Sequence, residues 1–288
     1  MRQVAAPGRW IWGLSGLVTI AALAIPGARL ITYAGVPSAT DIEPQTTVTR
    51  TVTVPQPVTS LDVQSYDGAS VRVTAGHVRR VRVTETITYS RPRGAGPPAV
   101  TQSVSGGRLT LADPVCQVSQ CSISFTVVVP PAVTVAAASQ GGPVTVSGIA
   151  GADLDSGGGP VRATEIKGHL TVATEDGPLE LDGLTGPLHA DTGGGPLLAD
   201  NVSAAAVTVI TGGGDARIVF AAAPDTVLVS TDGGPATLTV PGGPYAVSAN
   251  SDGGPQLVGI AADPAAGRSI TVTSGGGPLL IEPAPPAS

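Results

Sequence analysis

The sequence predicts an all-β fold: a single-stranded β-solenoid (β-helix-like) of about eight coils of 17–23 residues, capped by an N-terminal β-hairpin block and preceded by one transmembrane helix. The first observation behind this prediction is a phrase that occurs nine times: Ser or Thr, any residue, Gly or Asp, Gly, and usually Pro. The phrases begin at Ser65, Ser139, Ser156, Thr174, Thr192, Thr211, Thr231, Ser251 and Ser274. From Ser139 onward the phrases recur every 17–23 residues, a period that is typical of stacked coils.

The second observation is a period of two on both sides of each phrase. In the phrase at Thr174, for example, apolar residues stand before it at Leu170 and Val172 and after it at Leu179 and Leu181. Each coil should therefore contain two short strands with one face inward. Gln256 is the exception to this pattern. Glycines in three coils indicate a second corner: Gly151, Gly168 and Gly186.

Each turn should require glycine because a tight reversal of the chain calls for positive φ. The structural turn glycines predicted on this basis are Gly142, Gly159, Gly177, Gly195, Gly214, Gly234, Gly254 and Gly277. A phosphate cradle is the functional alternative, but such a loop opens a helix, whereas each of these turns opens a strand. The proline that usually follows presets φ and withholds an N–H group from the ladder.

The N-terminal part predicts export. Residues 1–9 form a cytoplasmic tail, residues 10–28 a charge-free apolar run long enough to span a bilayer, and residues 29–45 a linker. The positive-inside rule places the rest of the chain outside the cytoplasm, as a single-pass cell-membrane protein. The alternative is a signal peptide cleaved after Ala34.

Residues 46–131 are predicted to form a β-rich first coil and hairpin cap, residues 132–282 the solenoid repeats, and residues 283–288 a Pro-rich tail that ends the pairing. The Ser65 phrase marks the first coil, and the block after it should cover an otherwise open sheet edge. The strands expected in the block are Thr47–Val54, Val58–Ser65, Ser70–Thr74, Val78–Tyr89, Val100–Leu111 and Cys121–Val129.

Two cysteines, Cys116 and Cys121, are consistent with one small disulfide formed in an oxidising compartment. Free, partly buried thiols are the alternative. Their spacing excludes a redox CxxC motif, and two sulfurs without a neighbouring His or Cys make a poor metal site.

Charge divides unevenly along the chain. Residues 1–110 carry eleven Arg and five acids (11 − 5 = +6), whereas residues 111–288 carry four bases and sixteen acids (4 − 16 = −12). An acidic solenoid argues against nucleic acid as a partner. Six arginines form a basic cluster, the candidate contact for an acidic envelope polymer: Arg72, Arg79, Arg80, Arg82, Arg91 and Arg93.

No catalytic, cofactor-binding or metal-binding residue is predicted. The best candidate for a metal site combines Asp153, His169, His189 and Asp191, for which solvated surface side chains are the simpler interpretation. Calcium coils would need a nonapeptide period and repeated Asp, but only Asp176, Asp232 and Asp252 lie in these turns. Arg162 and Glu180 should form an exposed ion pair between neighbouring coils.

The combination of these features resembles the bacterial putative-adhesin family of β-strand-repeat proteins, of the domain of unknown function 4097 type. The resemblance rests on the membrane segment, the Cys-containing block ending at Val129-Pro130, the serial Ser/Thr-x-Gly-Gly turns and the sequence Val-Pro-Gly-Gly-Pro-Tyr-Ala-Val at 240–247. It covers residues 45–282 and implies an envelope location and an adhesin label. At the position after each Ser/Thr-x-Gly-Gly turn, members often carry a small polar or acidic residue, whereas this chain usually has Pro. Asp215 is the one acidic residue at these positions, so the chain departs from a pattern in which carboxylates there could have a role.

Three functional hypotheses follow. The first is a non-catalytic, membrane-anchored extracellular β-solenoid that acts as an adhesin or as a structural or binding protein of the cell envelope. The second is the ectodomain of an envelope sensing or accessory system that acts through a membrane protein partner. The third, a polysaccharide-active β-helix enzyme, has the least support. The expected partners are the membrane through residues 10–28, an envelope polymer or membrane protein, and further copies of the chain.

Overall fold

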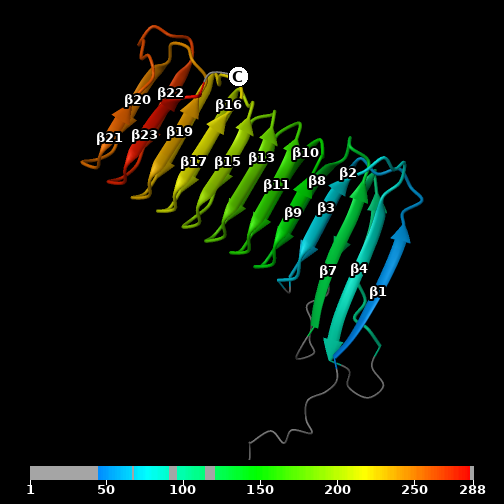
Figure 1. The fold of residues 1–288 in the computed structure, drawn as a ribbon. Helices are drawn as coiled ribbons and strands as arrows, with labels where there is room; N and C mark the ends of the chain where they lie inside the picture. Colours follow the sequence, from blue (N-terminus) through cyan, green and yellow to red (C-terminus); the bar gives the residue numbers. More distant parts are fainter. Residues whose placement is uncertain (1–44, 67, 91–95, 114–120, 286–288) are drawn as a thin grey trace, which may run out of the picture. The chain divides into compact units, whose positions relative to one another are not determined.

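A computed structural model describes residues 45–66, 68–90, 96–113 and 121–285, which fall within one compact unit, residues 44–288. The described residues form strands in two sheets and no helix (Figure 1). Sheet A contains, in spatial order, β1 (Gln45–Thr53), β4 (Arg82–Ser90), β7 (Cys121–Val129), β3 (Val71–Ala75), β9 (Val144–Ser147), β11 (Val161–Ile166), β13 (Leu179–Leu184), β15 (Leu197–Val202), β17 (Ala216–Phe220), β19 (Ala236–Val240), β23 (Leu279–Pro283) and β21 (Gln256–Val258). Sheet B contains β20 (Ala246–Asn250), β22 (Ser269–Thr273), β18 (Thr226–Thr231), β16 (Ala206–Thr211), β14 (Leu188–Asp191), β12 (Leu170–Thr174), β10 (Gly151–Ser156), β8 (Thr134–Ser139), β2 (Ser60–Ser65), β6 (Arg108–Ala112) and β5 (Thr101–Ser105).

The repeat builds β-solenoid-like coils, as the sequence predicts. Each coil runs through a strand of sheet B, the Ser/Thr phrase, and a strand of sheet A, and equivalent strands of neighbouring coils pair in parallel. The phrases are in register, since Ser156 pairs with Ser139 on one side and Thr174 on the other. The Ser65 phrase belongs to the same stack, because β2 pairs with β8 and β3 pairs with β9.

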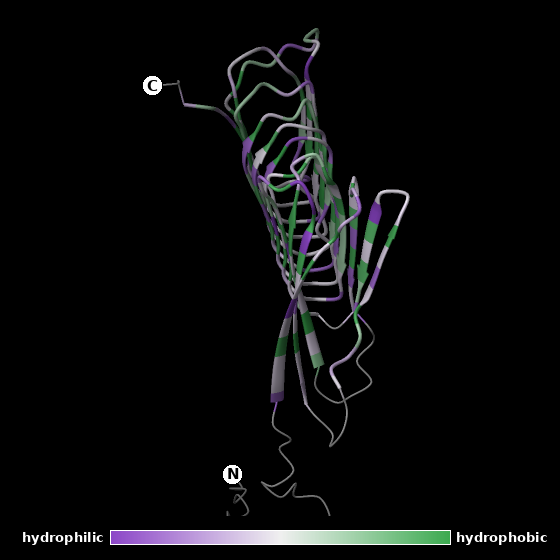
Figure 2. Cartoon of the chain, turned by 90° about the vertical axis from the view of Figure 1, so that its right-hand side faces the viewer, coloured by the Kyte–Doolittle hydropathy of each residue, from purple (hydrophilic) through white to green (hydrophobic). Residues whose placement is uncertain are grey.

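The core lies between the two sheets, which face each other with hydrophobic and hydrophilic residues alternating along the strands (Figure 2). The inward rows predicted from the period of two are buried; Leu170, Val172 and Leu179, for example, are at most 1% exposed. The third inward position is buried as well, in Ile149, Ile166, Leu184 and Val202. The buried core residues of the described segments run from Val54 to Ile281, all of them inside the compact unit of residues 44–288.

The N-terminal block extends both sheets beyond the first coil. In sheet A, β7 pairs with β3 in parallel, and β4 and β1 follow in antiparallel order. In sheet B, β6 pairs with β2 and β5 with β6. The prediction of one strand over Val100–Leu111 is wrong: Gly106 and Gly107, with φ of 56° and 80°, form a turn that splits it into the hairpin β5–β6. Strand β4 begins at Arg82 instead of Val78.

The last two coils are stacked in reverse order. Strands β22 and β23 lie between β18 and β20 and between β19 and β21, so the coil of residues 246–258 is outermost and the later coil of residues 269–283 is inserted beneath it (Figure 1). The Pro-rich tail therefore does not terminate the stack, contrary to the sequence prediction; Ala284 instead donates a backbone hydrogen bond to Val240, 2.7 Å.

The predicted tail, membrane span and linker, residues 1–44, lie outside the described residues, as do Cys116, Arg91 and Arg93. Within the part that is described, no helix has the length and apolar character needed to cross a bilayer. Cys121 is disulfide-bonded, and no described cysteine is free.

Candidate functional site

The predicted turn glycines occupy the corner between the two sheets, but for a different reason than positive φ. The eight glycines named above, Gly142 to Gly277, do not have left-handed φ angles. Instead, a Cβ atom on any of them would lie 2.1–2.3 Å from a carbonyl oxygen of the adjacent coil. Positive φ is found earlier in the turns, for example at Gly158 (118°) and Gly213 (119°). The glycine row is therefore required by the close stacking of the turns.

The Ser and Thr residues that open the phrases form a buried column along the same corner. All nine are at most 5% exposed. In seven of them the hydroxyl donates to the carbonyl oxygen three residues later, as in Thr192 to Gly195 at 2.7 Å. Ser65 instead donates to the carboxylate of Asp113, 3.0 Å, at the N-terminal end of the column. This corner is structural, because it leaves no hydroxyl facing solvent.

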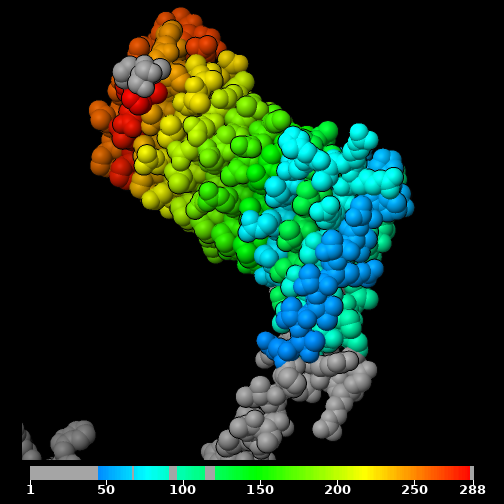
Figure 3. Space-filling model, turned by 45° about the vertical axis from the view of Figure 1, so that its right-hand side comes forward, coloured from blue at the N-terminus to red at the C-terminus, as the bar shows by residue number. Residues whose placement is uncertain are grey.

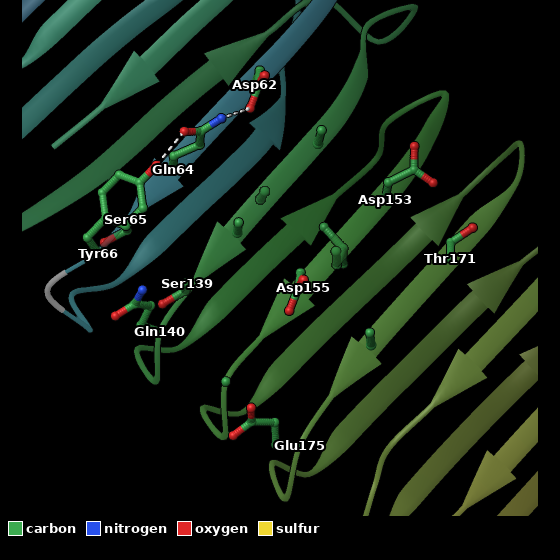
Figure 4. Close-up of a pocket in the computed structure, with 16 residues that line it drawn as sticks. Asp62, Gln64, Ser65, Tyr66, Ser139, Gln140, Asp153, Asp155, Thr171 and Glu175 are labelled. Carbon is green, nitrogen blue, oxygen red and sulfur yellow. Dashed lines mark hydrogen bonds between the residues drawn. The ribbon is translucent and has the colours of Figure 1, made fainter.

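A groove lies on the outward face of sheet B (Figure 4). It has a volume of about 860 Å³ and crosses β2, β8, β10 and β12. Its floor is formed by small side chains at outward positions, Ala136 and Ala138 of β8 and Ala173 of β12. The groove exists because these alanines are flanked by longer side chains on the neighbouring strands.

One rim of the groove is a hydrogen-bonded row on β2 and the turn after it. The Tyr66 hydroxyl donates to Oε1 of Gln64, 2.8 Å, and Nε2 of Gln64 donates to Oδ1 of Asp62 over 3.5 Å (Figure 4). Tyr66 is 42% exposed and places an aromatic ring beside the groove. The register Asp62–Ala136–Asp153 sets this rim opposite the second one across β8.

The second rim is acidic. Asp153 and Asp155 occupy consecutive outward positions of β10, and Glu175 lies in the turn after β12 (Figure 4). All three are exposed. Among the residues with described positions, no group of three or more His, Cys, Asp and Glu could hold a metal ion. The groove can offer carboxylates, a carboxamide and an aromatic face to a ligand, and the open carboxylates favour cationic or hydroxyl-bearing groups.

The His/Asp group considered from the sequence does not form one site. Nε2 of His169 lies 3.5 Å from Oδ1 of Asp153. His189 shares a row with Asp153, but Thr171 stands between them, so their strands are two spacings apart, about 9.6 Å. Asp191 accepts a hydrogen bond from the Gly193 N–H, 3.2 Å. Only Asp153 of the four lines the groove.

Four of the six predicted contact arginines are described, and all four are exposed. Arg72 of β3 and Arg82 of β4 point outward from sheet A, where Arg72 pairs with Thr126 and Arg82 with Val128 of the intervening β7. Arg79 and Arg80 lie in the connection that enters β4. Farther along the outward face of sheet A, the predicted ion pair of Arg162 and Glu180 is confirmed, with side chains 60% and 53% exposed.

Sequence reasoning missed the groove. Its signal was the outward row of sheet B, in which Ala136, Ala138 and Ala173 replace the longer residues of other coils. The contribution of Tyr66 and Gln64 could not be found in that row, because the 74 residues between the first two phrases conceal that β2 lies beside β8.

No protein-family model and no curated protein sequence matches this chain. Among solved structures, the chain is similar to a putative adhesin from Bacteroides fragilis, at 14% identity over 82% of this chain and 97% of that chain, with a TM-score of 0.46. A putative cell adhesion protein from Clostridium sporogenes matches at 13% identity over 83% and 100% of the two chains, with a TM-score of 0.31. A putative adhesin from Parabacteroides merdae matches at 12% identity over 82% and 95%, with a TM-score of 0.37. Similarity at this level carries no functional inference.

Proposed function

We propose that this chain is a non-catalytic surface-binding protein of the cell envelope, anchored in the membrane by residues 10–28 and acting as an adhesin through its solenoid. The observation that carries the proposal is the groove on sheet B, an open depression across four parallel strands. Its two rims, on β2 and β10, lie two strand spacings apart, about 9.6 Å. An extended polymer or a projecting surface group fits a depression of this form better than an enclosed small molecule does.

The side chains of the groove support binding over catalysis. Enzymes that hydrolyse glycosides typically hold two carboxyl groups in contrasting environments, so that one is the acid and the other stays ionised. Asp153, Asp155 and Glu175 are all exposed on the same open rim. Their common chemistry is attraction to positive charge and acceptance of hydrogen bonds. The ligand we propose is therefore an extended envelope polymer that carries amino or other cationic groups.

Binding of residues 44–288 to isolated cell walls and to an amine-bearing polysaccharide, measured across a salt series, tests this proposal. The variant Asp62→Asn/Asp155→Asn should lose affinity because it neutralises a carboxylate on each rim, and Ala138→Trp should lose it because it fills the floor. Asp215→Asn, an exposed acid outside the groove, is the matched control. Wild-type binding that is absent, or equal in all four proteins, would refute the groove as the binding surface.

The exposed arginines support a second ligand class, an acidic polymer bound on the outward face of sheet A. Arg72→Gln/Arg82→Gln should then weaken binding to an anionic wall polymer and reduce its salt dependence. Arg217→Gln, an exposed arginine in the same outward row, is the control. If neither polymer binds, a membrane protein partner becomes the better explanation.

A further inference from the structure

The two sheets end in four edge strands within the described residues, and they differ in length. Strand β21 has three residues, β5 and β20 have five each, and β1 has nine. Soluble proteins protect sheet edges by shortening them or by adding Pro, Lys or a bulge. The C-terminal edge of sheet A follows this rule, because β21 is short and comes directly after Pro255.

Strand β1 is long and lacks these protections, although its one charged side chain, Arg50, points to the inward face. Its sequence, Gln-Thr-Thr-Val-Thr-Arg-Thr-Val-Thr, contains no Pro and no Lys, and is dominated by β-branched residues. It pairs with β4 along its full length, from Gln45–Ser90 to Thr53–Arg82, without a bulge. Its residues are exposed or half-buried, and its atoms lie along the outer edge of the N-terminal block (Figure 3). The other edge of β1 can therefore accept a further strand.

The outward face beside this edge is an array of hydroxyl groups. Threonines of β1 stand opposite threonines of β4 at three successive outward positions. Two of these pairs are hydrogen-bonded through their side chains, Thr47 to Thr88 and Thr51 to Thr84, each at 3.1 Å. Thr–Thr pairing across strands is thus the interaction that already holds β1 on one side.

A second copy of β1 continues this pattern. If two β1 strands pair antiparallel about Thr49, Thr47 lies opposite the partner's Thr51, and Thr49 lies opposite the partner's Thr49. Residues 46–52 are paired in this register, and inward side chains remain inward because the register is even. The Thr pairs across the two-fold axis then repeat the Thr pairs that β1 makes with β4.

Charges are compatible with the same register. Arg50, the charged residue of β1, points to the inward face and stands opposite Glu85 of β4, which is 4% exposed. In the register about Thr49, Arg50 lies opposite the partner's Val48, so the two arginines do not face each other. Each therefore keeps the carboxylate of its own chain as its neighbour.

We propose that two copies of this chain form a symmetric dimer by antiparallel pairing of their β1 strands about Thr49. The interface is isologous, so it uses up both edges and closes at two copies rather than growing into a filament. A single strand pair is small for a protein interface, so the dimer forms at raised protein density and dissociates on dilution.

Disulfide cross-linking of the full chain in detergent micelles tests the register. In antiparallel pairs, directly opposed Cα atoms lie about 4.5–5.5 Å apart, which suits a disulfide. Thr49→Cys should therefore give a covalent dimer under mild oxidation, with a yield that rises with protein density. Thr101→Cys, an exposed threonine on the short edge strand β5, is the matched control, and the unmodified chain gives the background of its native cysteines.

Introduced charges then distinguish cross-links that form through β1 pairing from cross-links that form by random collision of two chains. In the Thr49→Cys background, Thr47→Lys/Thr51→Lys places like charges opposite each other twice and should lower dimer yield by up to about thirtyfold. Thr47→Glu/Thr51→Glu should do the same, whereas an equimolar mixture of the two should restore the dimer. Restoration also shows that both variants are folded. Equal yields from Thr49→Cys and Thr101→Cys, or no effect of the Lys pair, would overturn the proposal.

Discussion

Replacing Gly195 by alanine should destabilise the solenoid far more than the same change at its neighbour Gly194. Neither residue has a left-handed φ, so backbone strain is matched. A Cβ at Gly195 would lie 2.2 Å from the carbonyl oxygen of Gly177 in the adjacent coil. A Cβ at Gly194 would meet only the Asp176 carboxylate, at 2.7 Å, and that flexible side chain can turn away.

The cost follows from the separation that the new methyl group imposes. Cβ atoms essentially never lie within 3.0 Å of another atom, so the two turns must move apart by at least 3.0 − 2.2 = 0.8 Å. Two hydrogen bonds join the same turns, Gly194 N–H to Glu175 and Leu179 N–H to Pro196, both 2.9 Å. At about 3.7 Å neither remains a hydrogen bond. Two lost bonds and the disturbed packing amount to about 2–4 kcal/mol.

Thermal unfolding of residues 44–288 followed by circular dichroism measures this difference. For a unit of this size, the expected loss lowers the midpoint by roughly 4–16 °C in Gly195→Ala. Gly194→Ala should stay close to the wild type, and could gain slightly because alanine restricts the unfolded chain. Equal midpoints for the two variants would refute the conclusion that the glycine row is fixed by contact between coils.

Three further predictions concern single side chains. Thr192→Val removes the hydroxyl that donates to Gly195 inside the corner and should cost about 1–2 kcal/mol in urea unfolding, whereas Thr192→Ser, which keeps the donor, should cost less. Burial raises the pKa of Glu85, so the folded state binds its proton more tightly than the unfolded state; the stability from this residue is complete below about pH 4.5 and is lost as the pH rises through the folded pKa. Glu85→Gln should thus gain stability relative to the wild type between pH 4 and pH 7, and a constant difference across that range would contradict the argument. Arg162→Gln should change stability by less than about 1 kcal/mol, because its pair with Glu180 is screened by solvent; a larger loss in unfolding experiments would show a role beyond the ion pair.

The coil architecture could be predicted from the sequence because its determinants are local. Inward and outward residues alternate within each strand, so Leu170, Val172 and Leu179 identify their own positions without knowledge of any neighbour. The phrase spacing then places equivalent residues of successive coils side by side. The ion pair of Arg162 and Glu180 was predictable for the same reason.

The reason for the glycine row could not be predicted, because it depends on contact between coils. Sequence shows that Gly195 follows Thr192 by three residues, but not that a carbonyl of the preceding coil lies against its Cα. The hydroxyl of Thr192 had a sequence signal, since all nine phrases open with Ser or Thr. Its buried donation to Gly195, repeated in six other phrases, gives the hydroxyl a structural role in the corner.

The reversed order of the last two coils has a physical explanation in the one residue that breaks the inward pattern. In consecutive stacking, Gln256 would stand at a buried position between Ala236 and Leu279, where an unpaired carboxamide costs about 1–3 kcal/mol. In the observed order, Leu279 takes that position at 2% exposure, and Gln256 lies exposed on the edge strand. Both coils present compatible rows to β18 and β19, so apolar pattern alone does not choose between them. Gln256 decides the order, because the coil that carries it is suitable only for the end of the stack. A terminal repeat needs a polar outer face.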